Sequence, residues 1–398
     1  ITHALDVYGL MQPVTELYAL TLDEDNTVTK IEKMSALPST PFDGEVRDMK
    51  EMFATPTLKD MHNHLDKTYM TLGWRATQPV KNLKERLAEE ANELPLLAAS
   101  TKNRASKMID AMMRRGVSHI RTHVNIDPYV GLKNLEGVLA AIENYQHLMT
   151  FEVIAFPQHG LLRDGMNHLM KEALRSGATM VGGLDPGGID NAVENSLYEI
   201  MSLATEFDAD VDIHLHDRGH LGTYTYSRWL DLVEENNYQG RSAMSHGFSL
   251  GDVSEGEQDE LITRIVANNL SIMSTIPHGQ KKALPPIDKI RRVGGNVYLG
   301  CDGFFDSWSS YVSSDLLEKV NNFCQITGKI TEVEISQTLN LATRGLSTYN
   351  DSKAPWIAVG DVANILFTEV ASSAELIARL PQKRTVLLNG HWIEPEYI

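Results

Sequence analysis

From about residue 110 onward, one pattern repeats along the chain: a short apolar run rich in β-branched residues, a loop, and an amphipathic segment that often ends at glycine. The starts of the seven runs in this region lie 25 to 33 residues apart, about the length of one strand with one crossover helix. With one earlier run, the expected strands are Phe53–His64, Val117–Val124, Thr150–Phe156, Thr179–Leu184, Val211–His216, Ser242–His246, Ser271–Thr275 and Asn296–Asp302. The helical patterns between them include Lys102–Arg115, Leu135–His147, Met166–Arg175, Val193–Phe207, Gln258–Asn268 and Ile287–Val293.

Eight such units in about 300 residues predict an α/β fold of the TIM (β/α)8 barrel type, because barrel strands are buried on both faces and read as continuous apolar runs. A doubly wound open sheet is the alternative, but no G-x-G-x-x-G stretch precedes an expected helix. We therefore expect residues 51–350 to form a barrel domain that carries the catalytic site.

Both ends of the chain depart from this pattern, since they are β-rich and do not alternate with helices. Small separate sheets are marginal alone, so residues 1–50 and 351–398 are expected to form one small β-sandwich beside the barrel. The alternating stretches that predict it are Thr15–Leu22, Thr27–Lys33, Val362–Glu369 and Thr385–Trp392.

Composition excludes several classes of partner. The chain has 53 Asp and Glu against 36 Lys and Arg, and its formal charge of −17 repels nucleic acid and anionic lipid surfaces. No apolar run approaches the roughly 18 residues that span a membrane, and the first residues show no signal-peptide pattern. Cys301 and Cys324 form no CxxC motif, which fits a reducing compartment. We expect a cytoplasmic protein with no nucleic-acid or membrane partner.

Residues able to bind a metal or transfer a proton stand at the carboxyl ends of nearly all the expected strands. Barrel enzymes carry their active sites at that face, where the strand ends converge. His62 and His64 point to the same side of their strand, so both imidazoles can bind one metal. With His214 and Asp302 they offer three nitrogens and one carboxylate oxygen, a set suited to zinc or ferrous iron. The other residues at strand ends are His123, Gln158, Asp185, His216, Asp217 and His246.

These motifs resemble the amidohydrolase superfamily, whose members are metal-dependent hydrolases built as distorted barrels with a β-sandwich made from both chain ends. The motifs that carry the resemblance are Asp60–Asp66, Ile213-His214, Ser245-His246 and Gly300–Asp302. Those similar to the cytosine deaminase branch are Arg121–Val124, Ala155–Gln158, Val181–Gly183 and Asp302–Trp308. Those similar to relatives that remove an alkylamine from a triazine are Asp66-Lys67, Leu184–Pro186 and His214–Asp217.

The resemblance implies that a single divalent ion, zinc or iron, is held by His62, His64, His214 and Asp302. Binuclear members use a carboxylated lysine at the end of the fourth strand, and Val181–Asp185 contains none. A divalent ion lowers the pKa of bound water from 15.7 to about 7, so hydroxide forms near neutral pH. By the same resemblance, Asp302 would accept the proton of the attacking water, and His246 would stabilise the oxyanion or orient the hydroxide.

Other residues are expected in the substrate pocket. Gln158 offers one donor and one acceptor, which matches the cis-amide edge of a pyrimidine or triazine. Asp217 stands where cytosine deaminases carry a glutamate general acid, and His216 can share the proton transfer. Gly303 replaces a second aspartate of those enzymes, which weakens the case for strict cytosine specificity. Lys67 is expected to contact the substrate or form an ion pair. The remaining expected pocket residues are His123, Asp185, His278 and Trp308.

The sequence therefore predicts a mononuclear metal hydrolase that attacks an sp² carbon of a small nitrogen heterocycle and expels ammonia or an alkylamine. Hydrolysis of a cyclic amide is the nearest alternative, because both reactions pass through a tetrahedral carbon. A barrel that binds a small molecule without catalysis is the other class. The resemblance also implies a homo-oligomer.

Overall fold

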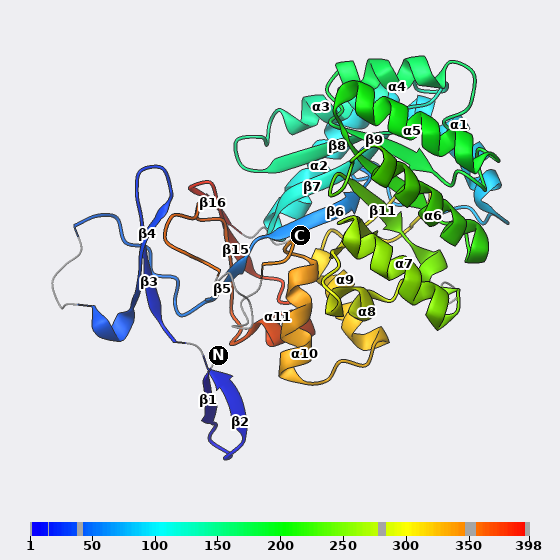
Figure 1. The fold of residues 1–398 in the computed structure, drawn as a ribbon. Helices are drawn as coiled ribbons and strands as arrows, with labels where there is room; N and C mark the ends of the chain where they lie inside the picture. The colour runs from blue at the N-terminus through cyan, green and yellow to red at the C-terminus, as the bar shows by residue number, and fades with distance from the viewer. Residues whose placement is uncertain (1, 15, 38–42, 278–283, 347–355, 395–398) are drawn as a thin grey trace.

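The computed structural model describes residues 2–14, 16–37, 43–277, 284–346 and 356–394. Its centre is an eight-stranded, all-parallel sheet that curls into a nearly closed barrel (Figure 1), which confirms the predicted α/β barrel. The strands follow one another in chain order: β6 (Leu58–Asn63), β7 (Val117–Asn125), β8 (Thr150–Phe156), β9 (Met180–Leu184), β10 (Asp210–Leu215), β11 (Ser242–His246), β12 (Ser271–Ser274) and β13 (Val297–Leu299).

Helices surround the barrel and bury apolar side chains against its strands. In α2, for example, Met108, Ile109 and Met112 are fully buried in the main core. The α-helices are α1 (Leu83–Leu97), α2 (Thr101–Arg114), α3 (Lys133–Ile142), α4 (Met166–Arg175), α5 (Val193–Phe207), α6 (Gly219–Glu235), α7 (Glu255–Ala267), α8 (Ile287–Arg292), α9 (Leu316–Ile326), α10 (Glu332–Gln337) and α11 (Ser373–Arg379). Within the described ranges, none of the helices has the length and apolar character that crossing a membrane requires.

The barrel closes between its first and last strands. The backbone N–H of Asp302 donates to the carbonyl of His62 at 2.9 Å, and Asn63 forms a single parallel bridge with Asp302. At Gly300 the two strands approach so closely that a Cβ atom would lie 2.4 Å from the backbone N and O of His62. This closing seam between β6 and β13 therefore joins the strand that carries His62 to the segment that carries Asp302.

Strands from both chain ends form smaller sheets beside the barrel (Figure 1), which confirms the predicted terminal β-sandwich. The larger sheet is antiparallel and consists of β16 (His391–Ile393), β15 (Arg384–Leu388), β14 (Ile365–Thr368) and β5 (Phe53–Pro56), in that order. A second sheet of β3 (Tyr18–Leu22) and β4 (Val28–Lys33) shares a small core with it, formed around Val28, Ile365 and Leu387. The domain boundaries at residues 50 and 351 stay predictions.

A further hairpin of β1 (Thr2–Leu5) and β2 (Met11–Val14) projects away from the barrel in Figure 1. Its tip is apolar and exposed, with Val7 and Tyr8 at 93% and 85% exposure. Thr15, where the first predicted terminal strand begins, lies outside the described residues.

Two predicted strands are wrong, because each is in fact a pair of strands. Phe53–His64 divides into β5, which pairs antiparallel with β14, and β6, which pairs parallel with β7. The division follows Pro56, which has no N–H to continue a ladder. Thr385–Trp392 is interrupted by Asn389-Gly390, both at positive φ (44° and 79°), the conformation of a tight hairpin turn.

The closing seam predicts that Gly300→Ala lowers the free energy of unfolding by about 1–3 kcal/mol, because the added methyl group would push β13 away from β6. Urea unfolding of the two proteins measures this difference. Gly256→Ala is the matched control, since nothing lies within 4 Å of a Cβ at that helical position, and it should be neutral or mildly stabilising. Unchanged stability of the Gly300 variant would contradict the close approach of the two strands.

Candidate active site

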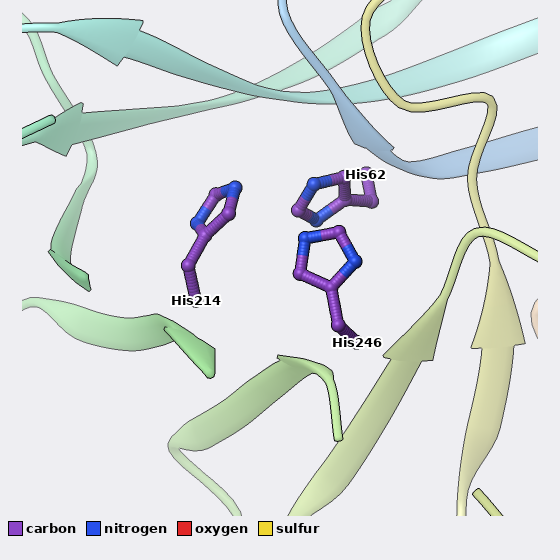
Figure 2. Close-up of side chains that lie close together, drawn as sticks. All are labelled: His62, His214 and His246. Atoms are coloured by element: carbon purple, nitrogen blue, oxygen red, sulfur yellow. The ribbon is translucent and has the colours of Figure 1, made fainter. Parts of the chain in front are cut away.

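Histidines from several strands converge at the carboxyl end of the barrel. Figure 2 shows His62 from β6, His214 from β10 and His246 from β11 with their rings gathered around one point. The ring of His62 lies 4.6 Å from that of His214 and 4.8 Å from that of His246. One ring nitrogen from each of the three lies within 4.8 Å of the others, a spacing at which they could hold a metal ion.

Asp302 and His64 extend this cluster. Nε2 of His62 and Nε2 of His64 lie 3.7 and 3.5 Å from Oδ1 of Asp302, and Nε2 of His64 lies 3.4 Å from Nε2 of His214. Two ligands at about 2.0–2.1 Å from a tetrahedral ion stand about 3.4 Å apart. The ligand atoms of His62, His64 and Asp302 all lie within 4.8 Å of one another, and His214 joins them through its 3.4 Å contact with His64. The four side chains of His62, His64, His214 and Asp302, hereafter the ligand set, are the candidate ligands of one divalent ion.

The hydrogen bonds of His62 and His64 engage Nδ1 of each ring and leave Nε2 facing this cluster. Nδ1 of His64 lies 3.1 Å from the carbonyl of His123, which can only accept, so Nδ1 carries the proton. Nδ1 of His62 lies 2.8 Å from Oγ of Ser245. Nε2 of His62 is buried and has no hydrogen-bond partner in the described part of the chain. A metal ion is a partner that fits this orphaned nitrogen.

The protonation states also suit a metal ion. Burial lowers the pKa of His64 and of His214 well below the ordinary value, so both imidazoles are neutral, the form that binds metals. Burial alone would raise the pKa of Asp302, but its contact with the His62 side chain holds it well below the ordinary value. His64 and His214 therefore offer neutral nitrogens, and Asp302 offers an ionised carboxylate.

Three site residues have left-handed backbone conformations where their strands end. The φ angles are 38° at Asp185, 70° at His246 and 64° at Asp302. Such conformations cost a non-glycine residue about 1–3 kcal/mol and gather at functional sites. Packing and hydrogen bonding of the surrounding chain must hold these side chains in place.

Asp185 fixes His216 beside His246. Its Oδ2 lies 3.0 Å from Nδ1 of His216, and its Oδ1 accepts the backbone N–H groups of His216 and Asp217. The rings of His216 and His246 lie 4.2 Å apart. An imidazole held by a carboxylate at one nitrogen can exchange a proton at the other.

The side chain of Asp217 is engaged by the loop that follows β9. Its Oδ2 accepts the backbone N–H groups of Gly187 and Gly188 at 3.2 and 3.0 Å. Burial and the neighbouring Asp185 carboxylate raise the pKa of Asp217 to about 6. The carboxylate of Asp217 therefore stabilises the loop after β9.

Lys67, Gln158 and Trp308 meet in a network with Glu90, a residue that the sequence did not single out. Nζ of Lys67 donates to Oε1 of Gln158 at 2.8 Å and lies 3.3 Å from Oε1 of Glu90. Nε1 of Trp308 donates to the same Glu90 oxygen at 2.7 Å. Glu90 is fully buried, and its position with Leu87 and Leu94 on the inner face of α1 is a signal that could have revealed it.

His123 lies among the other histidines, with its ring 4.2 Å from that of His214 and 4.4 Å from that of His62. Both of its ring nitrogens are buried and lack a hydrogen-bond partner among the residues that the structure describes. Burial also lowers its pKa well below the ordinary value, so this imidazole is neutral. His278 lies outside the described residues.

Comparison with known proteins gives a consistent result. A family model described as "Amidohydrolase family" matches residues 140–391. The uncharacterised protein YahJ of Escherichia coli K12 is 35% identical over 342 residues, which make up 85% of this chain and 74% of that protein.

Two solved structures are similar in fold. The structure of N-isopropylammelide isopropylaminohydrolase from Burkholderia multivorans ATCC 17616 has a TM-score of 0.85 and 26% identity, covering 93% of each chain. That of 5-methylcytosine deaminase from Klebsiella pneumoniae, liganded with phosphonocytosine, has a TM-score of 0.78 and 23% identity, covering 96% of each chain. These matches confirm the resemblance predicted from the motifs.

A buried carboxyl group beside the site generates a pH-dependent prediction. Oδ1 of Asp306 accepts the backbone N–H groups of Trp308 and Ser309, while burial raises the pKa of Asp306 to about 7. The carboxyl group of Asp306 therefore binds its proton more tightly in the folded protein than in the unfolded chain. The stabilisation from this group is complete below about pH 4 and is lost as the pH rises to about 7.

We therefore expect Asp306→Asn to be more stable than the wild type at pH 8, by up to about 4 kcal/mol. The difference should shrink toward zero near pH 4, because the wild-type carboxyl is then neutral as well. Urea unfolding of both metal-free proteins across this pH range measures it. A difference that does not depend on pH would contradict the raised pKa.

Proposed function

This chain belongs to the amidohydrolase family, and we propose that it uses one divalent ion, zinc or iron, to remove ammonia or an alkylamine from a nitrogen heterocycle such as a pyrimidine or triazine. The observation that carries the proposal is the grouping of His62, His64 and Asp302, whose ligand atoms lie within 4.8 Å of one another, with His214 in contact with His64 at 3.4 Å. The substrate class is supported by the similar structures, whose names describe an isopropylammelide hydrolase and a methylcytosine deaminase.

The metal and its nearest residues would generate the nucleophile. A divalent ion bound by the ligand set would lower the pKa of water from 15.7 to about 7. Asp302, which its histidine neighbours keep ionised, is the base that accepts the proton of the attacking water. His246 lies beside His62 and donates to the oxygen or nitrogen on which negative charge develops.

His216 is the best-supported donor of a proton to the leaving nitrogen. Its Nδ1 is held by Asp185, which leaves Nε2 for the reaction, and its ring lies against that of His246. The carboxylate of Asp217 already accepts two backbone N–H groups. We therefore assign the role of general acid to the pair of Asp185 and His216, with Asp217 supporting the loop.

Gln158 and Lys67 would recognise the ring. Oε1 of Gln158 already accepts from Lys67, and its Nε2 is a donor that can serve a ligand. A donor at this position fits a ring that presents an oxo group or an unprotonated ring nitrogen. Because Glu90 pairs with Lys67, the two buried charges cancel and do not call for an anionic substrate.

Metal content and product identity test the proposal together. Protein purified without chelator should contain about one zinc or iron per chain, and His62→Ala and Asp302→Asn should lose it. His168→Ala is the control, since His168 lies exposed on α4, and it should keep both metal and activity. The wild type should release ammonia or an alkylamine from at least one pyrimidine or triazine.

Each other result has a definite meaning. Two ions per chain would contradict a mononuclear site, and a protein without metal under any reconstitution would contradict the mechanism. A ring-opened acid as the product would establish the cyclic-amide hydrolase instead. A metal-loaded protein that is inert on every ring tested would favour a binding protein without catalysis.

The assignment of the general acid predicts different effects for two neighbouring aspartates. Asp185→Asn removes the carboxylate that orients His216, so kcat should fall by about 10²–10⁴ while the metal content stays unchanged. Asp217→Asn keeps an oxygen that can accept from Gly187 and Gly188, so its loss should be less than about tenfold. Steady-state kinetics of both variants measure this, and a large loss in Asp217→Asn alone would transfer the role to Asp217.

A further inference from the structure

A line of buried polar groups leads from the candidate metal site toward the amino ends of the barrel strands. Nδ1 of His62 lies 2.8 Å from Oγ of Ser245, and this hydroxyl donates to Oδ1 of Asp212 at 2.7 Å. Oδ2 of Asp212 accepts from Nη1 of Arg121 at 3.0 Å, and Arg121 also donates to Glu152. His62, Ser245 and Asp212 are completely buried. Nothing in the proposed function uses Ser245 or Asp212.

The direction of each hydrogen bond in this line follows from simple chemistry. The carboxylate of Asp212, paired with Arg121, has only acceptor oxygens. Ser245 has one hydroxyl proton, and it is given to Asp212, so its oxygen must accept from His62. Nδ1 of His62 therefore carries the ring proton, and Nε2 presents its lone pair to the other ligands.

We propose that Ser245 and Asp212 are positioning residues of the metal site, which hold His62 in the Nδ1–H tautomer and aim its Nε2 at the ion. The inference rests on the proposed function only in taking His62 as a metal ligand. His62 belongs to both groups of side chains that could hold a metal, so its orientation affects the whole ligand set.

The two neighbouring histidines of β6 are oriented by different means. His64 donates Nδ1–H to the backbone carbonyl of His123, which no side-chain substitution can remove. His62 depends on a serine side chain from β11, which Asp212 of β10 orients in turn. Partners of this kind typically change metal affinity by 10- to 100-fold when they are removed.

Ser245→Ala is the direct test. The variant removes the acceptor for Nδ1 of His62 but leaves the imidazole, so we expect the zinc dissociation constant to rise by about 10- to 100-fold. Competition between the metal-free protein and a chromophoric chelator for zinc measures this constant without substrate. Ser274→Ala is the matched control: Ser274 is equally buried on the neighbouring β12, and its Oγ has no hydrogen-bond partner among the described residues.

The Ser274→Ala control should bind zinc as the wild type does, because it loses an equivalent hydroxyl oxygen that makes no hydrogen bond to His62. If Ser245→Ala weakens zinc binding no more than Ser274→Ala, the inference is overturned. If the wild type binds neither zinc nor ferrous iron, the proposed function has failed instead, so the two failures can be told apart; a wild type that binds only ferrous iron is put through the same comparison with that ion.

A second pair of variants isolates the hydroxyl group even if Ser245→Ala folds poorly. Ser245→Thr and Ser245→Val have nearly the same shape, but only threonine keeps the hydroxyl. We expect the threonine variant to bind zinc at least about tenfold more tightly than the valine variant. Equal zinc affinities of the threonine and valine variants would overturn the inference, because both variants carry the same added methyl group and any effect of it on stability is shared.

Asp212→Asn tests whether the carboxylate acts through Ser245. The substitution should weaken zinc binding in the wild-type protein, because asparagine is a weaker acceptor for the serine hydroxyl. In the Ser245→Ala background it should add little, since the connection to His62 is already broken. If the losses of zinc affinity from Asp212→Asn and Ser245→Ala are fully additive, Asp212 acts on the fold alone, and its positioning role is overturned.

Discussion

The hydrogen bond from the N–H of Asp302 to the carbonyl of His62 joins the last strand of the barrel to the first, and the candidate site depends on that closure. Only glycine at position 300 lets the two backbones approach closely enough to form it. Asp60 strengthens the same seam, because its buried carboxylate accepts the backbone N–H groups of His62 and Cys301. Ligands that are remote in the sequence thus become neighbours through backbone contacts.

Closure also explains why the barrel interior can carry so many polar groups. The main apolar core combines residues of the strands and the helices, and Met61, Ala243 and Met273 of β6, β11 and β12 form a separate small cluster. The histidines of the site pack on one another and on Phe156, whose ring stacks on that of His214 at 4.1 Å. Buried imidazoles of this kind stay neutral, which makes them useful as ligands and tolerable in the core.

The sequence was sufficient for the strand order and for the histidines, because both follow from local patterns: a repeat of about thirty residues and polar residues at strand ends. The sequence was insufficient for features that depend on contacts between segments distant in the chain. Helical periodicity could mark Glu90 as facing inward, but not its pairing with Lys67, and the loop that engages Asp217 could not be located without coordinates. Asp212 could have been identified from the sequence, because it stands two residues before His214 on the same strand and its side chain must point the same way.

The charge of the pocket differs from that of the whole chain, which is −17. In the ligand set Asp302 carries the one negative charge, so a bound divalent ion would leave a net positive centre. Further out, Glu90 cancels the charge of Lys67. A positive centre stabilises the negative charge of a tetrahedral carbon in deamination and in amide hydrolysis alike. Under the proposed function, the choice of leaving group therefore depends on the residues proposed to surround the ring, His216, Gln158 and Lys67, rather than on the proposed metal ligands.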